Sequence, residues 1–109
     1  MNDETRSITV QELRRWRDEN REFALLDVRE PWELEICRFS DAHAIPLYDL
    51  TGRVSELKGS GPLVVICHHG IRSQQAVAWL RANGVVRAIN LSGGLDAWAR
   101  EIDPSMGVY

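Results

Sequence analysis

The residues best suited to chemistry lie together in one short segment, Cys-His-His-Gly-Ile-Arg-Ser, which runs from Cys67 to Ser73. A cysteine thiolate is a strong nucleophile, and a nearby cation or a helix N-terminus stabilises it. Arg72 supplies a permanent positive charge, and His68 and His69 can add partial charge near neutral pH. The segment therefore indicates a nucleophilic cysteine rather than a buried structural one.

The chain on either side of this segment predicts how the thiol is held. Residues 63–66 are all apolar, which predicts a buried strand, and residues from about 73 to 83 have helical periodicity. Gly70 permits a left-handed backbone, so the connection can curl and point successive N–H groups inward. We expect Cys67 at the mouth of an anion-binding loop at the carboxyl edge of a sheet, with backbone N–H groups of residues 68–73 facing it.

Short apolar runs alternate with helical patterns along the rest of the chain. Strands are expected at residues 23–28, 44–47, 63–66 and 86–91, and helices after Thr9, after Pro31, and over 54–57, 73–83 and 95–102. Thr9 and Glu12 have the spacing of a capping box, and Gly84 suits the end of the helix before it. Because strands alternate with helices, the sequence predicts an α/β fold with a largely parallel sheet.

Length and composition limit the class of protein. The chain has 109 residues, of which 44% are hydrophobic and 27% charged, with a net charge of −3. These values predict a single globular domain over residues 1–109. The longest apolar run, residues 63–67, is far below the about 20 residues that span a membrane, and the first seven residues are polar. We expect a cytoplasmic protein with two free cysteines that binds neither membrane nor nucleic acid.

The pattern Cys67-x-x-Gly70-x-Arg72-Ser73 resembles the active-site loop of the rhodanese (sulfurtransferase) family. Other segments follow in the family's order: residues 26–33 are similar to its Asp-Val-Arg segment, 44–46 to the strand after its Gly-His-Ile-Pro-Gly motif, and 91–98 to its Gly-Gly…Trp signature. The chain departs from the pattern at residues 37–41, where Cys-Arg and Ser-Asp replace Gly-His and Pro-Gly. The resemblance implies a three-layer α/β/α domain with a mostly parallel, five-stranded sheet.

The resemblance also implies a reaction. The Cys67 thiolate would take a sulfane sulfur from thiosulfate or a similar donor, carry it as a persulfide, and pass it to cyanide, a thiol or a protein. Substrate would be bound by His68, His69, Gly70, Ile71, Arg72 and Ser73, with the Arg72 guanidinium holding the anionic donor. No metal or organic cofactor is expected. The tail from Ile102 to Tyr109 resembles the ends of rhodanese domains fused to enzymes that adenylate sulfur-carrier proteins, which favours a sulfur-relay role.

Two other functions stay open at this point. Cysteine phosphatases and arsenate reductases use a similar loop, but their pattern has five residues between cysteine and arginine, whereas four separate Cys67 from Arg72. The shorter loop encloses a smaller space, which suits one sulfur atom better than a phosphate. The second alternative is a non-catalytic rhodanese-like module that only binds a partner, although such modules often lack the cysteine.

The remaining polar residues have structural interpretations. Asp27 and Arg29 follow a strand, and we expect them to tie neighbouring loops together through hydrogen bonds and an ion pair with Glu33. Cys37 is a second thiol that could resolve the persulfide, although no spacing rule links it to Cys67.

A metal site made of Cys67, His68 and His69 is not expected. Adjacent residues rarely converge on one ion, and the separated ligand pairs typical of zinc sites are absent from the sequence.

Overall fold

The centre of the molecule is a parallel sheet of five strands. A computed structural model describes residues 7–109. The strands are β1 (Ser7–Ile8), β2 (Ala24–Asp27), β3 (His43–Ala44), β4 (Leu63–Ile66) and β5 (Ala88–Leu91). They lie in the order β1-β5-β4-β2-β3, and every neighbouring pair is parallel. Because β4 is the middle strand, the residue that follows it, Cys67, lies at the centre of the carboxyl edge.

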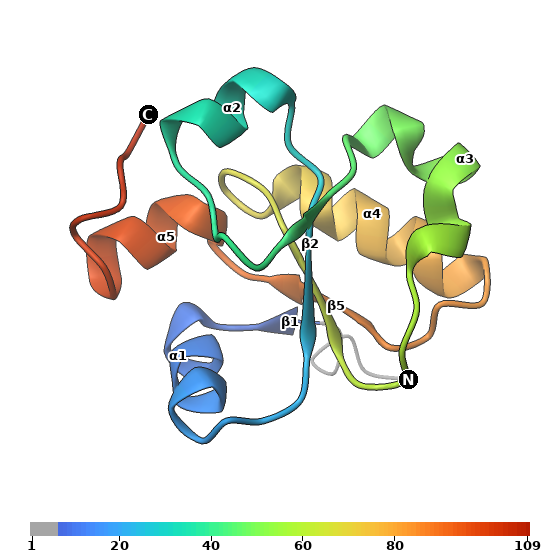
Figure 1. Ribbon diagram of the computed structural model, residues 1–109, viewed down its shortest axis with the longest axis horizontal. Helices are drawn as coiled ribbons and strands as arrows, with labels where there is room; N and C mark the ends of the chain where they lie inside the picture. Colours follow the sequence, from blue (N-terminus) through green and yellow to red (C-terminus); the bar gives the residue numbers. More distant parts are fainter. Residues whose placement is uncertain (1–6) are drawn as a thin grey trace.

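Helices cover both faces of this sheet. Helices α1 (Val10–Asp18) and α5 (Gly94–Glu101) lie on one side, and α3 (Leu50–Arg53) and α4 (Ile71–Ala82) lie on the other (Figure 1). Helix α2 (Pro31–Ile36) lies beyond the carboxyl end of β2 (Figure 1). The expected three-layer α/β/α architecture is therefore confirmed. None of the helices within residues 7–109 is long and apolar enough to cross a bilayer.

The core alternates along the central strand, because successive strand residues point to opposite faces. Val64 and Ile66 pack in the apolar cluster that includes side chains of α1 and α5. Leu63 and Val65 pack in the second cluster, which includes Ala76, Val77 and Leu80 of α4. All four strand residues are buried, which explains why the run is continuously apolar rather than alternating.

Two local predictions from the sequence are confirmed: the capping box at Thr9 and the helix end at Gly84. The Thr9 hydroxyl accepts the Glu12 N–H at 3.1 Å, and the Glu12 carboxylate accepts the Thr9 N–H at 3.0 Å, so the capping box is complete. Gly84 follows α4 with φ +95°, the left-handed conformation that ends a helix.

Two elements differ from the sequence prediction. Strand β1 was not predicted, because a two-residue strand at the edge of a sheet has no periodicity to detect. The helix expected over 54–57 begins earlier, as α3, and continues only as the short 3₁₀ helix η3 (Val54–Glu56), after another 3₁₀ helix, η2 (Leu47–Asp49). Leu50 is the buried residue of this segment, so its packing fixes where the helix forms.

Candidate active site

The Cys67 sulfur lies inside the loop that joins β4 to α4. The backbone N–H groups of Gly70 and Ser73 donate to Sγ at 3.1 and 3.3 Å. Gly70 has φ +96°, the left-handed conformation that turns its N–H inward, and Ser73 is in the first turn of α4. Two N–H groups directed at one sulfur, at the positive end of a helix, favour its anionic form.

The thiol lies at the floor of this loop rather than at its mouth. Cys67 is only 1% exposed, and its side chain belongs to the apolar cluster on the α4 face. The loop closes over the sulfur because the N–H groups that contact it belong to residues three and six positions further along the chain. A substrate must therefore enter the loop to reach Sγ.

A short hydrogen-bond relay leads from the thiol into the sheet. Ser73 Oγ lies 3.3 Å from Cys67 Sγ and donates to Asn90 Oδ1. Asn90 in turn donates through Nδ2 to the Gly70 carbonyl at 3.3 Å, which fixes the orientation of its amide. Because the Ser73 hydrogen is directed at Asn90, the thiol donates its own hydrogen to Ser73 Oγ. When the thiol loses that proton, the Ser73 hydroxyl can turn and donate to the sulfur.

Arg72 is held by a buried carboxylate. Its Nη1 and Nη2 donate to the two Glu33 oxygens at 2.6 and 2.7 Å, with Glu33 only 3% and Arg72 34% exposed. Burial alone would raise the pKa of Glu33, but hydrogen bonds from Arg72, the Glu30 backbone and Tyr109 outweigh it and lower the pKa to about 2. The prediction that Glu33 forms an ion pair with Arg29 is wrong, because the Arg72 guanidinium pairs with the carboxylate instead.

Arg29 has a different set of partners. It forms a fully buried ion pair with Asp27, with Nη2 to Oδ2 at 2.8 Å and Nε to Oδ1 at 3.0 Å. It also donates to the backbone carbonyls of Glu33 at 3.3 Å and Cys37 at 2.7 Å. Arg29 thus connects the end of β2 to α2 and to the segment where the sequence departs from the rhodanese pattern.

The second thiol is on the other side of the sheet. Cys37 packs against the cluster on the α1 and α5 face, whereas Cys67 belongs to the cluster on the α4 face. Both cysteines are free. This placement does not bring Cys37 to the Cys67 loop, where a resolving thiol would have to lie.

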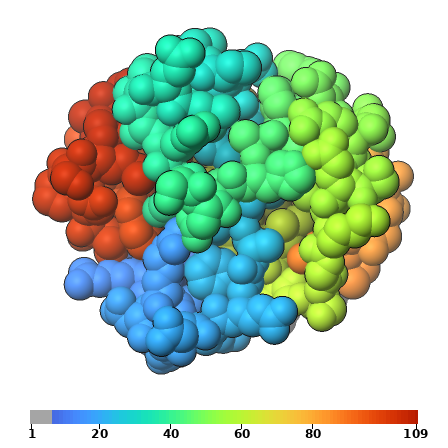
Figure 2. All heavy atoms as spheres, viewed as in Figure 1, coloured from blue at the N-terminus to red at the C-terminus, as the bar shows by residue number. Residues whose placement is uncertain are grey.

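Tyr109 reaches the loop although no motif marked it. Its ring stacks on His68 with 3.7 Å between centroids and 7° between planes. Its hydroxyl accepts from Arg29 at 2.9 Å and donates to Glu33 at 2.7 Å. Burial, with the hydrogen bond to Glu33, raises the pKa of Tyr109 to about 12, although Arg29 opposes the shift. The C-terminal segment meets α2 at the surface (Figure 2), and only the resemblance of the tail hinted at this position.

The first turn of α5 is hydrogen-bonded to the backbone of the Cys67 loop. The N–H groups of Leu95 and Asp96 donate to the carbonyls of Cys67 and His68, both at 2.9 Å. Gly94 has φ +61°, and a Cβ there would lie 2.4 Å from the Cys67 carbonyl oxygen. Gly94 is therefore required because the two turns touch backbone to backbone, whereas Gly93 is required by its φ of +81° and by the Ala97 Cβ, 2.6 Å from where its own Cβ would lie.

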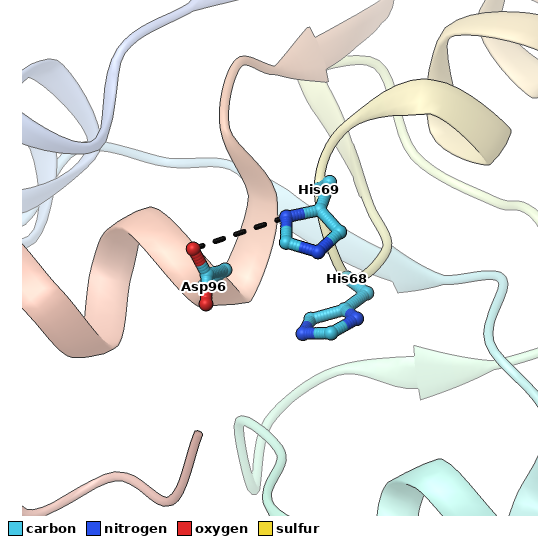
Figure 3. A group of neighbouring side chains, drawn as sticks. All are labelled: His68, His69 and Asp96. Atoms are coloured by element: carbon cyan, nitrogen blue, oxygen red, sulfur yellow. Dashed lines mark ion pairs between the residues drawn. The ribbon is translucent and has the colours of Figure 1, made fainter. Parts of the chain in front are cut away.

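The remaining predicted site residues lie on the outer side of the loop. His68 is half-buried, while His69 and Ile71 are exposed. The two imidazole rings are 3.9 Å apart, and Asp96 of α5 lies beside them, 3.8 Å from His69 Nδ1 (Figure 3). A cavity of about 400 Å³ opens next to the loop between α4 and β5, and Cys67 is not among its lining residues.

Together these features define a parallel α/β domain with a thiol enclosed by backbone N–H groups at the carboxyl edge of its sheet. The model of the rhodanese-like domain family matches residues 9–101. The chain belongs to the rhodanese-like domain family, as the sequence resemblance predicted.

Known proteins of the family resemble both its sequence and its structure. A sulfurtransferase from Allochromatium vinosum is 40% identical over 76 residues, covering 70% of this chain and 71% of that protein. The probable adenylyltransferase/sulfurtransferase MoeZ of Mycobacterium tuberculosis is 37% identical over 105 residues, covering 94% of this chain but only 27% of that protein. The crystal structure of a rhodanese-related protein from Thermoplasma volcanium has a TM-score of 0.80 at 32% identity, covering 89% of this chain and 93% of that one. The chain is thus a rhodanese-like domain with sulfurtransferase relatives, and it spans about a quarter of the length of MoeZ.

Proposed function

We propose that the domain transfers a sulfane sulfur through a persulfide on Cys67. The observation that carries this proposal is the pair of N–H groups, from Gly70 and Ser73, that donate to Sγ. Such donors stabilise the thiolate that attacks, and they suit the persulfide anion that forms. The fold and the sulfurtransferase relatives support the same chemistry.

The reaction proceeds in two displacements at sulfur. The Cys67 thiolate attacks the outer sulfur of thiosulfate or a similar donor, and the donor's sulfur–sulfur bond breaks so that sulfite leaves with the electron pair. A thiophilic acceptor then attacks the outer sulfur of the persulfide, and Cys67 leaves as the thiolate. Atoms and electrons balance without a metal or an organic cofactor.

Arg72 is our candidate for holding an anionic donor. Its guanidinium has five N–H groups, of which the hydrogen bonds to Glu33 use two, so others can reach donor oxygens. Glu33 fixes the guanidinium and offsets its charge at the same time. The partly neutralised guanidinium can therefore hold a donor with one negative charge, such as a persulfide, as well as the doubly charged thiosulfate.

A protein acceptor fits the relatives that combine adenylyltransferase and sulfurtransferase in one chain. In this proposal the domain serves a sulfur relay, and cyanide is only a surrogate acceptor in the assay.

The test is sulfur loading measured by intact mass. After treatment with thiosulfate and removal of excess donor, we expect the protein to gain one sulfur atom, and Cys67→Ser to gain none. Cys37→Ser is the matched control and should load as the unchanged protein does. Thiocyanate formation from thiosulfate and cyanide should follow the same pattern.

Two results would replace the proposal with one of the alternatives. Turnover of an aryl phosphate without sulfur loading would indicate a phosphatase. Failure to load from both thiosulfate and a small-molecule persulfide would indicate a binding module.

A further inference from the structure

Three metal-ligating side chains meet on the outer side of the catalytic loop. One nitrogen each from His68 and His69 and one carboxylate oxygen from Asp96 all lie within 4.8 Å of one another. The two histidines follow β4, and the aspartate is in the first turn of α5. Figure 3 shows both imidazole rings beside the carboxylate, with the His69 Nδ1 directed towards it.

Two polar atoms of this cluster have no hydrogen-bond partner. His68 Nε2 and Asp96 Oδ1 are buried, and within residues 7–109 only Arg17 Nε shares that condition among side-chain nitrogens and oxygens. A buried polar atom without a hydrogen-bond partner destabilises the folded protein. A ligand bound between the two atoms would give each of them a partner.

The chemistry of the donor set selects the ligand. Two imidazoles and one carboxylate suit divalent transition-metal ions of intermediate softness, such as Zn²⁺. Arg100 donates to Asp96 Oδ2 at 2.9 Å, which orients the carboxylate and leaves Oδ1 for a ligand.

We propose that His68, His69 and Asp96 form a binding site for one Zn²⁺-like ion, with water completing its coordination. Ligand atoms around tetrahedral zinc are about 3.4 Å apart, given metal–ligand bonds of about 2.0–2.2 Å. The cluster therefore needs to contract, and the two stacked rings, with 32° between their planes, must open towards one ion. His69, whose side chain is 59% exposed, can rotate to supply both changes. The Cys67 sulfur takes no part, because the N–H groups of Gly70 and Ser73 hold it on the inner side of the loop.

The proposed residue set differs from the one that the sequence analysis considered, which was Cys67, His68 and His69. That set contained adjacent residues alone, whereas the third ligand comes from a different helix. The backbone bond from the Asp96 N–H to the His68 carbonyl, at 2.9 Å, is what brings the carboxylate to the histidines.

Calorimetric titration with Zn²⁺ at neutral pH tests the proposal. The full chain is used without an affinity tag and with both thiols removed, as Cys37→Ser with Cys67→Ser, so that neither sulfur can bind the metal. We expect saturable binding of one Zn²⁺ per chain. His69→Ala and Asp96→Asn should each weaken the affinity by about tenfold or more.

His43→Ala is the matched control. His43 is also a partly exposed imidazole beside a carboxylate, 2.8 Å from Glu56, but it has no second histidine next to it. Its substitution should leave the affinity unchanged. No saturable binding, equal loss with His43→Ala, or undiminished binding after His69→Ala would each overturn the proposal.

Proton NMR of the imidazole rings gives a second readout that needs no substitution in the cluster. On addition of Zn²⁺ the ring resonances of His68 and His69 should shift or broaden before those of His43. The reverse order would also refute the site. Because both measurements use protein without Cys67, their outcome is independent of sulfur transfer.

Discussion

Two turns of this molecule have the same design and different roles. The turn from β4 to α4 and the turn from β5 to α5 both leave a parallel strand and both begin a helix at a left-handed glycine, Gly70 at φ +96° and Gly93 at φ +81°. In the first turn, N–H groups donate to the Cys67 sulfur. In the second, they donate to the carbonyls of Cys67 and His68. The two helix starts thus differ in what their inward N–H groups contact, the thiol sulfur in the first turn and the protein's own carbonyls in the second.

The largest effect is expected from adding a methyl group between the two turns. Gly94→Ala places a Cβ 2.4 Å from the Cys67 carbonyl oxygen at a positive φ, so the loops must separate. We expect a loss of about 3–5 kcal/mol in the free energy of unfolding, measured in urea, and loss of sulfur loading. Gly84→Ala is the control, since it has φ +95° but nothing within 4 Å, and should cost about 1–2 kcal/mol. Equal costs at the two glycines would show that contact between the turns is unimportant.

The next largest effect is expected from neutralising Glu33, the carboxylate that pairs with Arg72 of the first turn. Glu33→Gln should cost on the order of 3 kcal/mol at neutral pH, because Arg72 and Tyr109 lose a buried anionic partner. The pKa of Glu33 in the folded protein, about 2, lies below its ordinary value of 4.5. Its contribution is therefore fully present above pH 4.5 and is lost as the pH falls towards about 2.

Thermal unfolding of the unchanged protein and of Glu33→Gln, measured from neutral to acidic pH, checks the direction of this pH dependence. The difference in stability should be largest at neutral pH and should shrink below pH 4.5. Glu35→Gln, on the exposed side of the same helix, is the control and should change stability by less than about 0.5 kcal/mol. A difference that does not vary with pH would contradict the ionised role of Glu33.

The smallest effect is expected on the reactivity of Cys67, when the Ser73 hydroxyl is removed and the backbone N–H of the same residue is kept. Ser73→Ala keeps the N–H that donates to Sγ and removes the hydroxyl 3.3 Å from it. We expect alkylation of Cys67 by iodoacetamide, in a Cys37→Ser background, to slow by about tenfold at neutral pH because the thiolate loses one donor. Ser92→Ala, in the second turn and exposed, should leave the rate unchanged. An unchanged or faster rate in Ser73→Ala would assign thiolate stabilisation to the backbone alone.

The sequence predicted the first turn well and its surroundings poorly. An apolar run, a glycine and a helical pattern are local signals, so Cys67, Gly70 and the limits of α4 could be located from residue types and spacing. The partners of that turn are distant in sequence: Glu33 lies 39 residues from Arg72, and Asn90 lies 17 residues from Ser73. Their contacts depend on which strands are neighbours in the sheet, and periodicity does not determine strand order.

Local sequence patterns also did not predict how deeply Cys67 is buried. A strand-end cysteine beside a polar loop predicts access from solvent, whereas the observed 1% exposure depends on how tightly the loop closes. Tyr109 and Asp96 belong to the same class of residue, since the fold brings each to the loop from another segment.

The enclosure of that sulfur has a consequence for its resistance to oxidation. Thiolates exposed to peroxide pass through sulfenic acid to sulfinic and sulfonic acids, and the last steps are irreversible. A sulfur enclosed by its own loop has little surface that an oxidant can reach. The same enclosure that limits the access of reactants to the thiol also limits its oxidation.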